Sequence, residues 1–173
     1  MEMRALTTLV EQRRTMVDEK NRITNRLRTA LKQYYPQVLD WFDHIDTPIF
    51  CDFIRQWPTL IQVKRARKTT LEAFFHQHNM RFAQVLADRL DAIKTATPLT
   101  MDDAVIIPYR LQVQVLIEQL SVTLEGIKQF DQTVESIARK HPDFPLFDAL
   151  PGAGPSLAPR LLVAFGEQRG TDT

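Results

Sequence analysis

Apolar residues recur every three or four positions from the start of the chain to Pro36, which is the period of an α-helix. They are Leu6, Leu9, Val10, Met16, Val17, Ile23, Leu27, Leu31 and Tyr34. The pattern predicts one helix of about thirty residues, longer than the roughly 8 to 20 residues of most globular helices. Such a length is typical of a coiled coil or of one arm of a long helical hairpin, although Arg13 and Lys20 interrupt the apolar stripe.

Helical periodicity returns after Thr100 and predicts a second long helix that runs to about Lys140. Its apolar positions are Val113, Ile117, Leu120, Leu124, Ile127 and Val134. Thr100 offers a hydroxyl to cap the first turn, and the Asp102-Asp103 carboxylates suit the positive end of the helix dipole. Because Pro108 has no amide proton and clashes with the preceding turn, we expect a kink or a break there and a continuous helix only beyond it.

Shorter apolar and aromatic clusters, separated by prolines, lie between the two long patterns. The clusters are Trp41-Phe42, Ile49-Phe50, Leu71-Phe74-Phe75 and Phe82-Val85-Leu86, and the prolines are Pro36, Pro48, Pro58 and Pro98. The sequence holds no alternating run bounded by hairpin turns, no internal repeat and no low-complexity tract. The predicted fold class is therefore all-α, with long helical-hairpin or coiled-coil arms and a small helical insert.

The overall composition indicates a folded chain without a global attraction to charged partners. Of 173 residues, 44% are hydrophobic, which is enough to build a core. With a net charge of +1, binding to nucleic acid would have to come from local clusters of basic residues. The lone Cys51 cannot form a disulfide framework and the N-terminus is no signal peptide, so we expect a cytoplasmic protein. The longest stretch without Asp, Glu, Lys or Arg, Ala149 to Pro159, is too short to span a membrane.

Basic residues cluster in two parts of the chain. Residues 2–35 carry eight Lys or Arg against four acids, and residues 53–71 carry five with no acid. Cations one helical turn apart, such as Arg22 and Arg26, suit successive phosphates and make binding salt-dependent. The candidate nucleic-acid-binding residues in these clusters are Arg13, Arg14, Arg22, Arg26, Arg28, Lys64, Arg65, Arg67 and Lys68. The alternative is that these cations only form ordinary solvent-exposed helix faces and bind no ligand.

The sequence shows no convincing catalytic or metal-binding pattern. His76 and His78 are two positions apart and point to different faces of a helix, which disfavours a metal site. The Asp102-Asp103 pair could offer carboxylates to a metal ion, but its place at a helix start favours a capping role. Cys51 lies among apolar residues without a neighbouring base, which predicts a buried and unreactive thiol. We therefore expect no cofactor or metal ion in this chain.

A glycine-rich stretch near the end, Leu150-Pro151-Gly152-Ala153-Gly154-Pro155, breaks the helical pattern. The residues before it can form a short helix, and Pro159 fits the first turn of a following helix that is capped near Ser156. The stretch thus predicts a helical hairpin whose turn, Gly152-Ala153-Gly154, can bring backbone amides close to a phosphate. It resembles the turn of helix-hairpin-helix DNA-binding motifs. An ordinary connecting turn is the alternative.

Several short motifs, in order along the chain, resemble those of a known family. They are Leu9-Val10-Glu11-Gln12-Arg13-Arg14, Asp18-Glu19-Lys20-Asn21-Arg22-Ile23-Thr24-Asn25-Arg26-Leu27, Trp57-Pro58-Thr59-Leu60, Arg67-Lys68-Thr69-Thr70-Leu71, Phe74-Phe75 and Leu150-Pro151-Gly152-Ala153-Gly154-Pro155. Together they are similar to insertion-sequence transposases of the DEDD type, the insertion-sequence one-ten family, which is related to the Piv and MooV invertases. The resemblance covers nearly the whole chain.

The resemblance implies a recombinase that cuts and rejoins DNA. Members of the family hold divalent metal ions on four acids of an RNase H-like domain and carry a catalytic serine in a separate C-terminal domain. Some are guided by a structured RNA. On this comparison the fourth acid would lie before Met1 and the serine beyond Thr173, and Ser156 does not match it. We therefore expect an internal fragment that lacks both catalytic centres and is inactive alone.

The sequence thus favours the dimerising, nucleic-acid-contacting helical region of a DNA transposase or recombinase. The expected partners are DNA and, as in some members of the family, a structured guide RNA. We expect a homodimer, because the two long apolar seams exceed what one chain of this length easily covers. The predicted organisation is a helical coiled-coil and insert region over 1–142 and the start of the C-terminal transposase domain over 143–173. The alternative function is a helical scaffold that binds another protein through its long helices.

Overall fold

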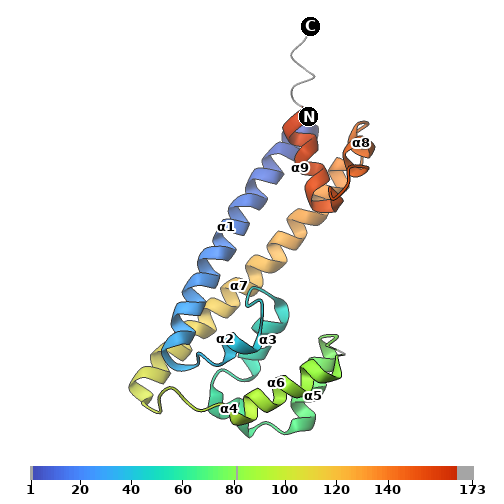
Figure 1. Cartoon of the computed structure of the whole chain (residues 1–173). Coiled ribbons are helices and arrows are strands. Elements are labelled where there is room, and N and C mark those ends of the chain that lie inside the picture. Colours follow the sequence, from blue (N-terminus) through green and yellow to red (C-terminus); the bar gives the residue numbers. More distant parts are fainter. Residues whose placement is uncertain (1, 81, 167–173) are drawn as a thin grey trace. The chain divides into compact units, whose positions relative to one another are not determined.

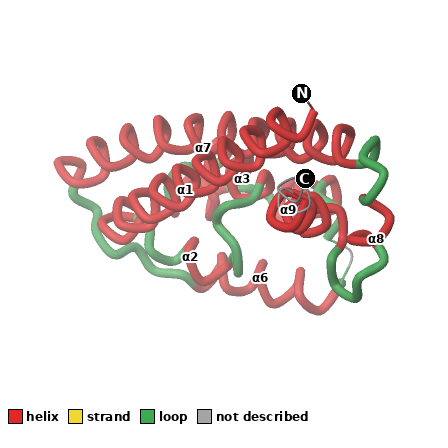
Figure 2. The backbone as a smooth tube through the Cα atoms, turned by 90° about the horizontal axis from the view of Figure 1, so that it is seen from above, coloured by secondary structure: helices red, strands yellow, loops and turns green. Residues whose placement is uncertain are grey.

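All regular structure in the described part of the chain is helical. A computed structural model describes residues 2–80 and 82–166, and within these ranges Figures 1 and 2 show helices joined by turns and loops, without a strand. The helices are α1 (Glu2–Tyr34), α2 (Val38–Trp41), α3 (Pro48–Gln56), α4 (Leu60–Arg65), α5 (Lys68–Gln77), α6 (Ala83–Thr95), α7 (Asp103–Ala138), α8 (Phe144–Asp148) and α9 (Gly154–Gly166). The predicted all-α class with a small helical insert is confirmed.

The two long helices, α1 and α7, match the two long periodic patterns. α1 ends at Tyr34, just before Pro36, and α7 ends at Ala138. The cap of α7 differs in detail from the prediction: the Asp102 carboxylate accepts the Ala104 amide at 2.9 Å, while Thr100 accepts the amide of Asp102 itself. Neither of these helices, nor any other in the described ranges, is long and apolar enough to cross a lipid bilayer.

We expected a kink or a break at Pro108, and the break is wrong, because α7 runs continuously through this residue from Asp103. A proline inside a helix leaves the carbonyl four residues earlier, here that of Ala104, without its amide partner. Both Pro108 and Ala104 are exposed, so water can hydrate that carbonyl. A single lost hydrogen bond near the solvated start of a long helix is therefore tolerated.

The chain forms two compact units, which are described separately below. One comprises Met1–Glu19 with Glu125–Thr173, and the other comprises Lys20–Leu124. Helices α1 and α7 contribute to both units, and they share a hydrophobic cluster in each. The predicted domain boundary after residue 142 was based on the family resemblance, whereas these two units are defined by how compactly the chain packs. The predicted boundary therefore stays a prediction.

In the unit of Met1–Glu19 and Glu125–Thr173, the start of α1 packs with the end of α7 and with the hairpin of α8 and α9. The buried members of this cluster are Leu6, Val134, Ala138, Phe144, Ala153, Ala158 and Leu162. Arg13 of α1, which interrupts the apolar stripe, forms an ion pair with Asp131, which falls on the seam of α7. The two charges that break the apolar pattern thus compensate each other.

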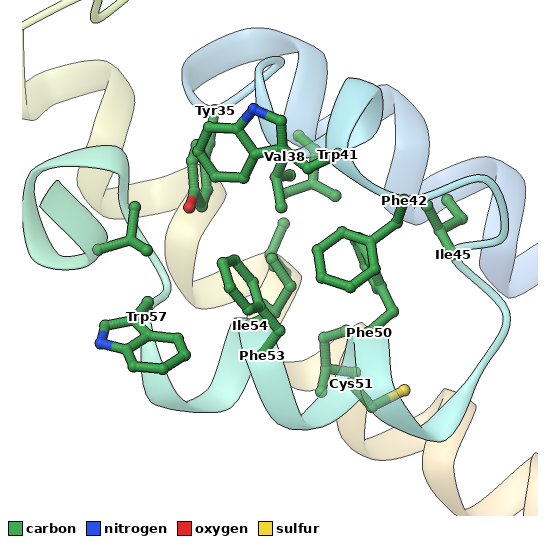
Figure 3. Packing of buried hydrophobic residues seen from close by; sticks show 14 of the residues in the cluster. Tyr35, Val38, Trp41, Phe42, Ile45, Phe50, Cys51, Phe53, Ile54 and Trp57 are labelled. Atoms are coloured by element: carbon green, nitrogen blue, oxygen red, sulfur yellow. The ribbon is translucent and has the colours of Figure 1, made fainter. Parts of the chain in front are cut away.

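The unit of Lys20–Leu124 has a core rich in aromatic rings (Figure 3). Phe53 of α3 lies at its centre with no exposed surface. The centroid of its ring lies 5.0 to 6.2 Å from those of five other aromatic side chains, Trp41, Phe42, Trp57, Phe74 and Phe75. These rings come from α2, α3, α5 and the segments that follow α2 and α3, so their contacts hold the insert together.

The apolar seams of α1 and α7 face each other inside this second unit. Leu27 and Leu31 of α1 belong to the same buried cluster as Val113, Ile117 and Leu120 of α7, and all five are fully buried. The seams therefore need no second copy of the chain to cover them. This corrects the reason for which we expected a homodimer.

The glycine-rich stretch forms the turn between α8 and α9, as predicted, but the second helix starts earlier than expected. α9 begins at Gly154 rather than after a cap at Ser156, and Pro159 consequently lies inside the helix instead of in its first turn. Gly152 and Gly154 adopt positive φ angles of 80° and 50°. Positive φ at two positions is what favours glycine in this turn.

Candidate nucleic-acid interface

The four cations of the basic run, Lys64, Arg65, Arg67 and Lys68, lie where α4 ends and α5 begins. Lys64 and Arg65 form the last turn of α4, where the negative end of the helix dipole favours cations. Arg67 is extended and precedes α5, whose first residue is Lys68. All four side chains are exposed. The short connection between α4 and α5 thus gathers these charges within five consecutive residues at the surface.

An open groove of about 490 Å³, here called the lysine groove, lies beside the basic run. Helices α4, α5 and α6 enclose it, and α6 contacts both of the others. The floor is apolar, since the partly accessible Ala66, Ala87 and Leu90 line the groove and the buried Val63, Leu71 and Ile93 border it. The groove therefore combines an apolar floor with the charged residues at its rim.

Three lysines and one acid line the rim of the lysine groove: Lys64, Lys68, Lys94 and Asp91. Lys64 donates a hydrogen bond to the carbonyl of Ala96, which fixes its ammonium group near the end of α6. Lys94 was not among the predicted residues, because it lies in a helix with balanced charges and only the packing of α6 on α4 brings it to the basic run. Lys94 thus adds a cation across the groove, while Asp91 offsets one positive charge of the rim.

The basic residues of α1 in the unit of Lys20–Leu124 lie on its solvent side. Arg22, Arg26 and Arg28 are exposed, whereas Ile23 and Leu27, which are adjacent to them in sequence, are buried. The packing of α1 on the core therefore leaves the three arginines exposed to solvent, with Arg22 and Arg26 one turn apart. These exposed positions are compatible with phosphate contacts.

Arg26 also borders an open groove of about 450 Å³ between α1 and α7. Asn25 and Gln112 contribute amide groups to its lining, and Tyr109 contributes an aromatic ring. The groove offers hydrogen-bonding groups beside a cation, which is chemistry that nucleic-acid-binding proteins use.

The two remaining arginines of α1, Arg13 and Arg14, lie in the other unit and differ from each other. Arg13 is bound to Asp131, and only 20% of its side chain is exposed. Arg14 is exposed. The ion pair gives Arg13 a structural role, so of the two Arg14 is the better placed for a ligand.

The turn Gly152-Ala153-Gly154 divides into a buried and an exposed part. The side chain of Ala153 is 3% exposed and belongs to the core of its unit, and the Ala153 amide donates to the carbonyl of Leu150 at 3.0 Å. The side chain and the amide of Ala153 are thus engaged within the unit, and its place among the candidate phosphate contacts stays a prediction. Both glycines are exposed, and a Cβ atom added to either would meet no atom within 4 Å.

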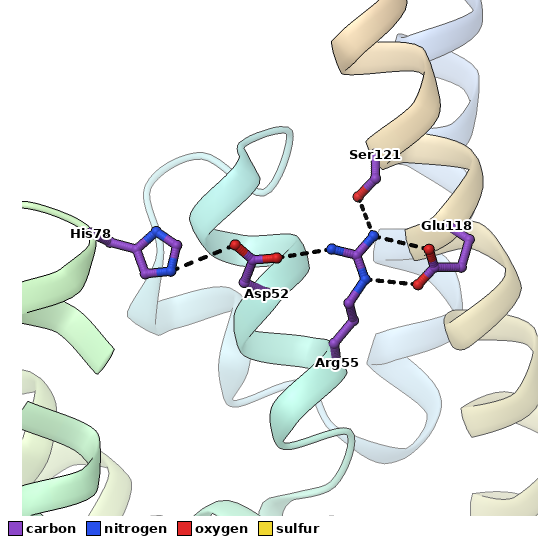
Figure 4. Close-up of polar contacts among 5 residues, drawn as sticks. All are labelled: Asp52, Arg55, His78, Glu118 and Ser121. Carbon is purple, nitrogen blue, oxygen red and sulfur yellow. Dashed lines mark hydrogen bonds and ion pairs between the residues drawn. The ribbon is translucent and has the colours of Figure 1, made fainter. Parts of the chain in front are cut away.

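Arg55, the fifth cation of the acid-free stretch, belongs to an intramolecular network instead (Figure 4). Its guanidinium donates to the Glu118 carboxylate at 2.7 and 3.0 Å, to Asp52 at 2.8 Å and to the hydroxyl of Ser121 at 2.6 Å. These hydrogen bonds lower the pKa of Glu118 and raise the pKa of Arg55. The network joins α3 to α7, and His78 of the segment after α5 lies 3.6 Å from Asp52.

The residues considered for metal binding or reactivity have other environments. His78 lies beside Asp52 while His76 is exposed, and no three His, Cys, Asp or Glu side chains in the described part of the chain are grouped as metal ligands would be. Cys51 is buried, as predicted, and burial raises the pKa of its thiol. The surface features worth testing are therefore the basic ones.

Comparison with known proteins finds a similar sequence in Streptomyces coelicolor, a protein described as "Mini-circle putative transposase for IS117". The two sequences are 25% identical over 170 residues, which cover 95% of this chain and 41% of the relative. The chain thus spans less than half the length of this relative. No family model matches the chain, and no solved structure matches it.

Proposed function

We propose that this chain is the helical, nucleic-acid-contacting region of a transposase and acts in DNA transposition. The observation that carries the proposal is its similarity to the Streptomyces transposase over 95% of its residues. The proposal gives this region a binding role. It places the cutting and joining of DNA in other parts of the transposase, where the family resemblance expects four acids with divalent metal ions and a serine.

The surface of the unit of Lys20–Leu124 supports the binding role. The basic run is exposed at the junction of α4 and α5, and Lys94 adds a further cation across the lysine groove. Each duplex phosphate that a Lys or Arg neutralises releases condensed counterions, so binding through such a surface weakens steeply with salt. We propose DNA as the main partner and a structured RNA as the second one.

The test is to measure affinity for duplex DNA and for a structured RNA at about 50 and about 200 mM salt by fluorescence anisotropy. The variant replaces Lys64, Arg65, Arg67 and Lys68 with Gln. We expect weaker binding and a smaller dependence of log affinity on log salt, the slope changing by up to about 0.9 for each lost duplex phosphate contact. Unchanged affinity and unchanged slope would refute the proposal.

A matched control separates the basic run from net charge. Arg4, Lys128, Lys140 and Arg160 are exposed and lie in the other compact unit, so their replacement with Gln removes the same four charges elsewhere. This control should bind nearly as well as the parent chain. An equal loss in both variants would show that only the total charge matters and would contradict a localised interface.

We further propose that the chain forms a homodimer, through an exposed face of α7 rather than through the buried seams. Ile107, Leu111, Val115 and Val122 follow one another at helical spacings on α7 and are 46 to 72% exposed. An exposed aliphatic stripe of this kind is typical of an interaction surface. Pairing two copies of it about a two-fold axis would contribute about 1 kcal/mol for each half-exposed side chain that becomes buried.

Light scattering tests the dimer with the double variant Leu111→Glu and Val115→Glu. Because both positions are exposed, the mass should fall to that of a monomer while the helical circular dichroism stays unchanged. Leu27→Asp is the contrasting variant, since it places a carboxylate in the core and should unfold the unit. A parent chain that remains monomeric at tens of micromolar would refute the homodimer. If that chain also bound neither DNA nor RNA, the helical scaffold would be the better description.

A further inference from the structure

We infer that the lysine groove binds an unstacked base of a single-stranded nucleic acid, with the adjoining phosphates held by the lysines at its rim. The inference rests on the proposed nucleic-acid contact and specifies which form of nucleic acid this surface takes. A surface that only follows the backbone of a duplex would need cations alone. The lysine groove has, in addition, an apolar floor, which offers no hydrogen bond or charge to a phosphate.

The floor has the chemistry and the size that suit a base. Ala66, Ala87 and Leu90 give the groove an apolar surface that solvent can reach, and the buried Val63, Leu71 and Ile93 border it from the core. Its volume of about 490 Å³ lies within the roughly 300 to 1,000 Å³ of small-ligand pockets, so it can admit a base with its sugar. In a duplex the faces of the bases are stacked and cannot enter, whereas a single strand can turn one base onto an apolar surface.

The charges at the rim match a nucleotide better than they match a simple anion. Lys64, Lys68 and Lys94 are exposed on three different helices around the groove, which suits the phosphates on either side of an inserted base. Asp91, on the same rim, would repel a fatty acid or an acidic peptide segment. Its carboxylate can instead accept a hydrogen bond from an amino group of a base, as acidic side chains do with cytosine.

The groove is held in shape without a ligand. α6 packs on both α4 and α5, and its Leu86 and Ile93 are anchored in the core of the unit. Lys64 is fixed to the Ala96 carbonyl at the end of α6. Little order is therefore lost when a base binds, which favours affinity.

The experiment fills the groove without changing its charge and without adding a ring on which a base could stack. Ala87 lines the groove and is exposed on α6, so Ala87→Leu places a branched aliphatic side chain in the space that the base would occupy. Ala73→Leu is the matched control, because Ala73 is also exposed, lies in α5 and does not line the groove. Both variants carry one larger aliphatic side chain at the surface. The probes are a single-stranded DNA and a single-stranded RNA of about 12 nucleotides, and a DNA duplex of the same length.

We expect Ala87→Leu to weaken binding of both single strands by about tenfold, the lower part of the range for bases that stack on aromatic rings, because this floor is aliphatic. Its duplex affinity and its salt slope should equal those of the parent chain, and Ala73→Leu should behave as the parent does with every probe. Single-strand binding that is unchanged or strengthened in Ala87→Leu, or is weakened equally in both variants, would overturn the inference. A parent chain that binds neither single strands nor duplex would overturn the proposed function as well. Duplex binding with unchanged single-strand binding in Ala87→Leu would overturn the groove alone.

Discussion

Replacing Phe53 with Ala should remove the centre of the aromatic core in the unit of Lys20–Leu124. The side chain is fully buried, and truncating a buried Phe to Ala costs about 3 to 5 kcal/mol through lost burial and the cavity left behind. The five aromatic neighbours place Phe53 above the lower end of that range, because each ring pair contributes about 0.5 to 1.5 kcal/mol beyond its buried area. We therefore expect a loss of about 4 kcal/mol, a large part of the roughly 5 to 15 kcal/mol that stabilises a domain.

Urea unfolding followed by tryptophan fluorescence measures this loss directly. Both tryptophans of the chain, Trp41 and Trp57, lie against Phe53, so their emission reports the unit that the substitution affects. With an m-value of about 2 kcal/mol per molar urea, the midpoint should fall by roughly 2 M. Phe82→Ala is the control, since Phe82 is 78% exposed and its loss should leave the midpoint nearly unchanged. Equal midpoints for the two variants would show that the ring cluster does not form the core.

Two further predictions concern polar contacts and the turn. Glu118→Gln removes the carboxylate that pairs with Arg55, and it should destabilise the chain by only about 0.5 kcal/mol at pH 7, because that carboxylate is largely exposed. Since Arg55 lowers the pKa of Glu118 in the folded state, the difference in stability from the parent should vanish as the pH falls through that lowered pKa. Urea midpoints that differ equally at pH 7 and pH 2 would contradict this prediction. Gly154→Val should lower the thermal midpoint, because φ is positive at this residue, although no atom lies within 4 Å of an added Cβ. Gly154→Asn should lower the midpoint less, since Asn tolerates positive φ better than Val does. Equal midpoints for the two variants would rule out backbone strain as the cause.

The periodic patterns were sufficient to predict the helical class and the two long helices. Each pattern depends on spacings within one segment, and the 3.6-residue period fixes which side of a helix is apolar whatever that side packs against. For the same reason the basic run and the exposed arginines of α1 could be recognised as candidates. Buried Cys51 and the turn between α8 and α9 were likewise predictable from their neighbours in the chain.

Contacts between distant residues decided what the local patterns left open. The pattern could not reveal that the seams of α1 and α7 cover each other, that Arg13 is paired with Asp131, or that Ala153 is buried, because each of these depends on a partner far along the chain. The local pattern likewise could not reveal that α7 continues through Pro108, near the start of the helix where Ala104 and Pro108 are exposed. The lysine groove is the clearest case: Lys64 and Lys94 lie 30 positions apart, and only the packing of α6 against α4 and α5 sets them around one apolar floor.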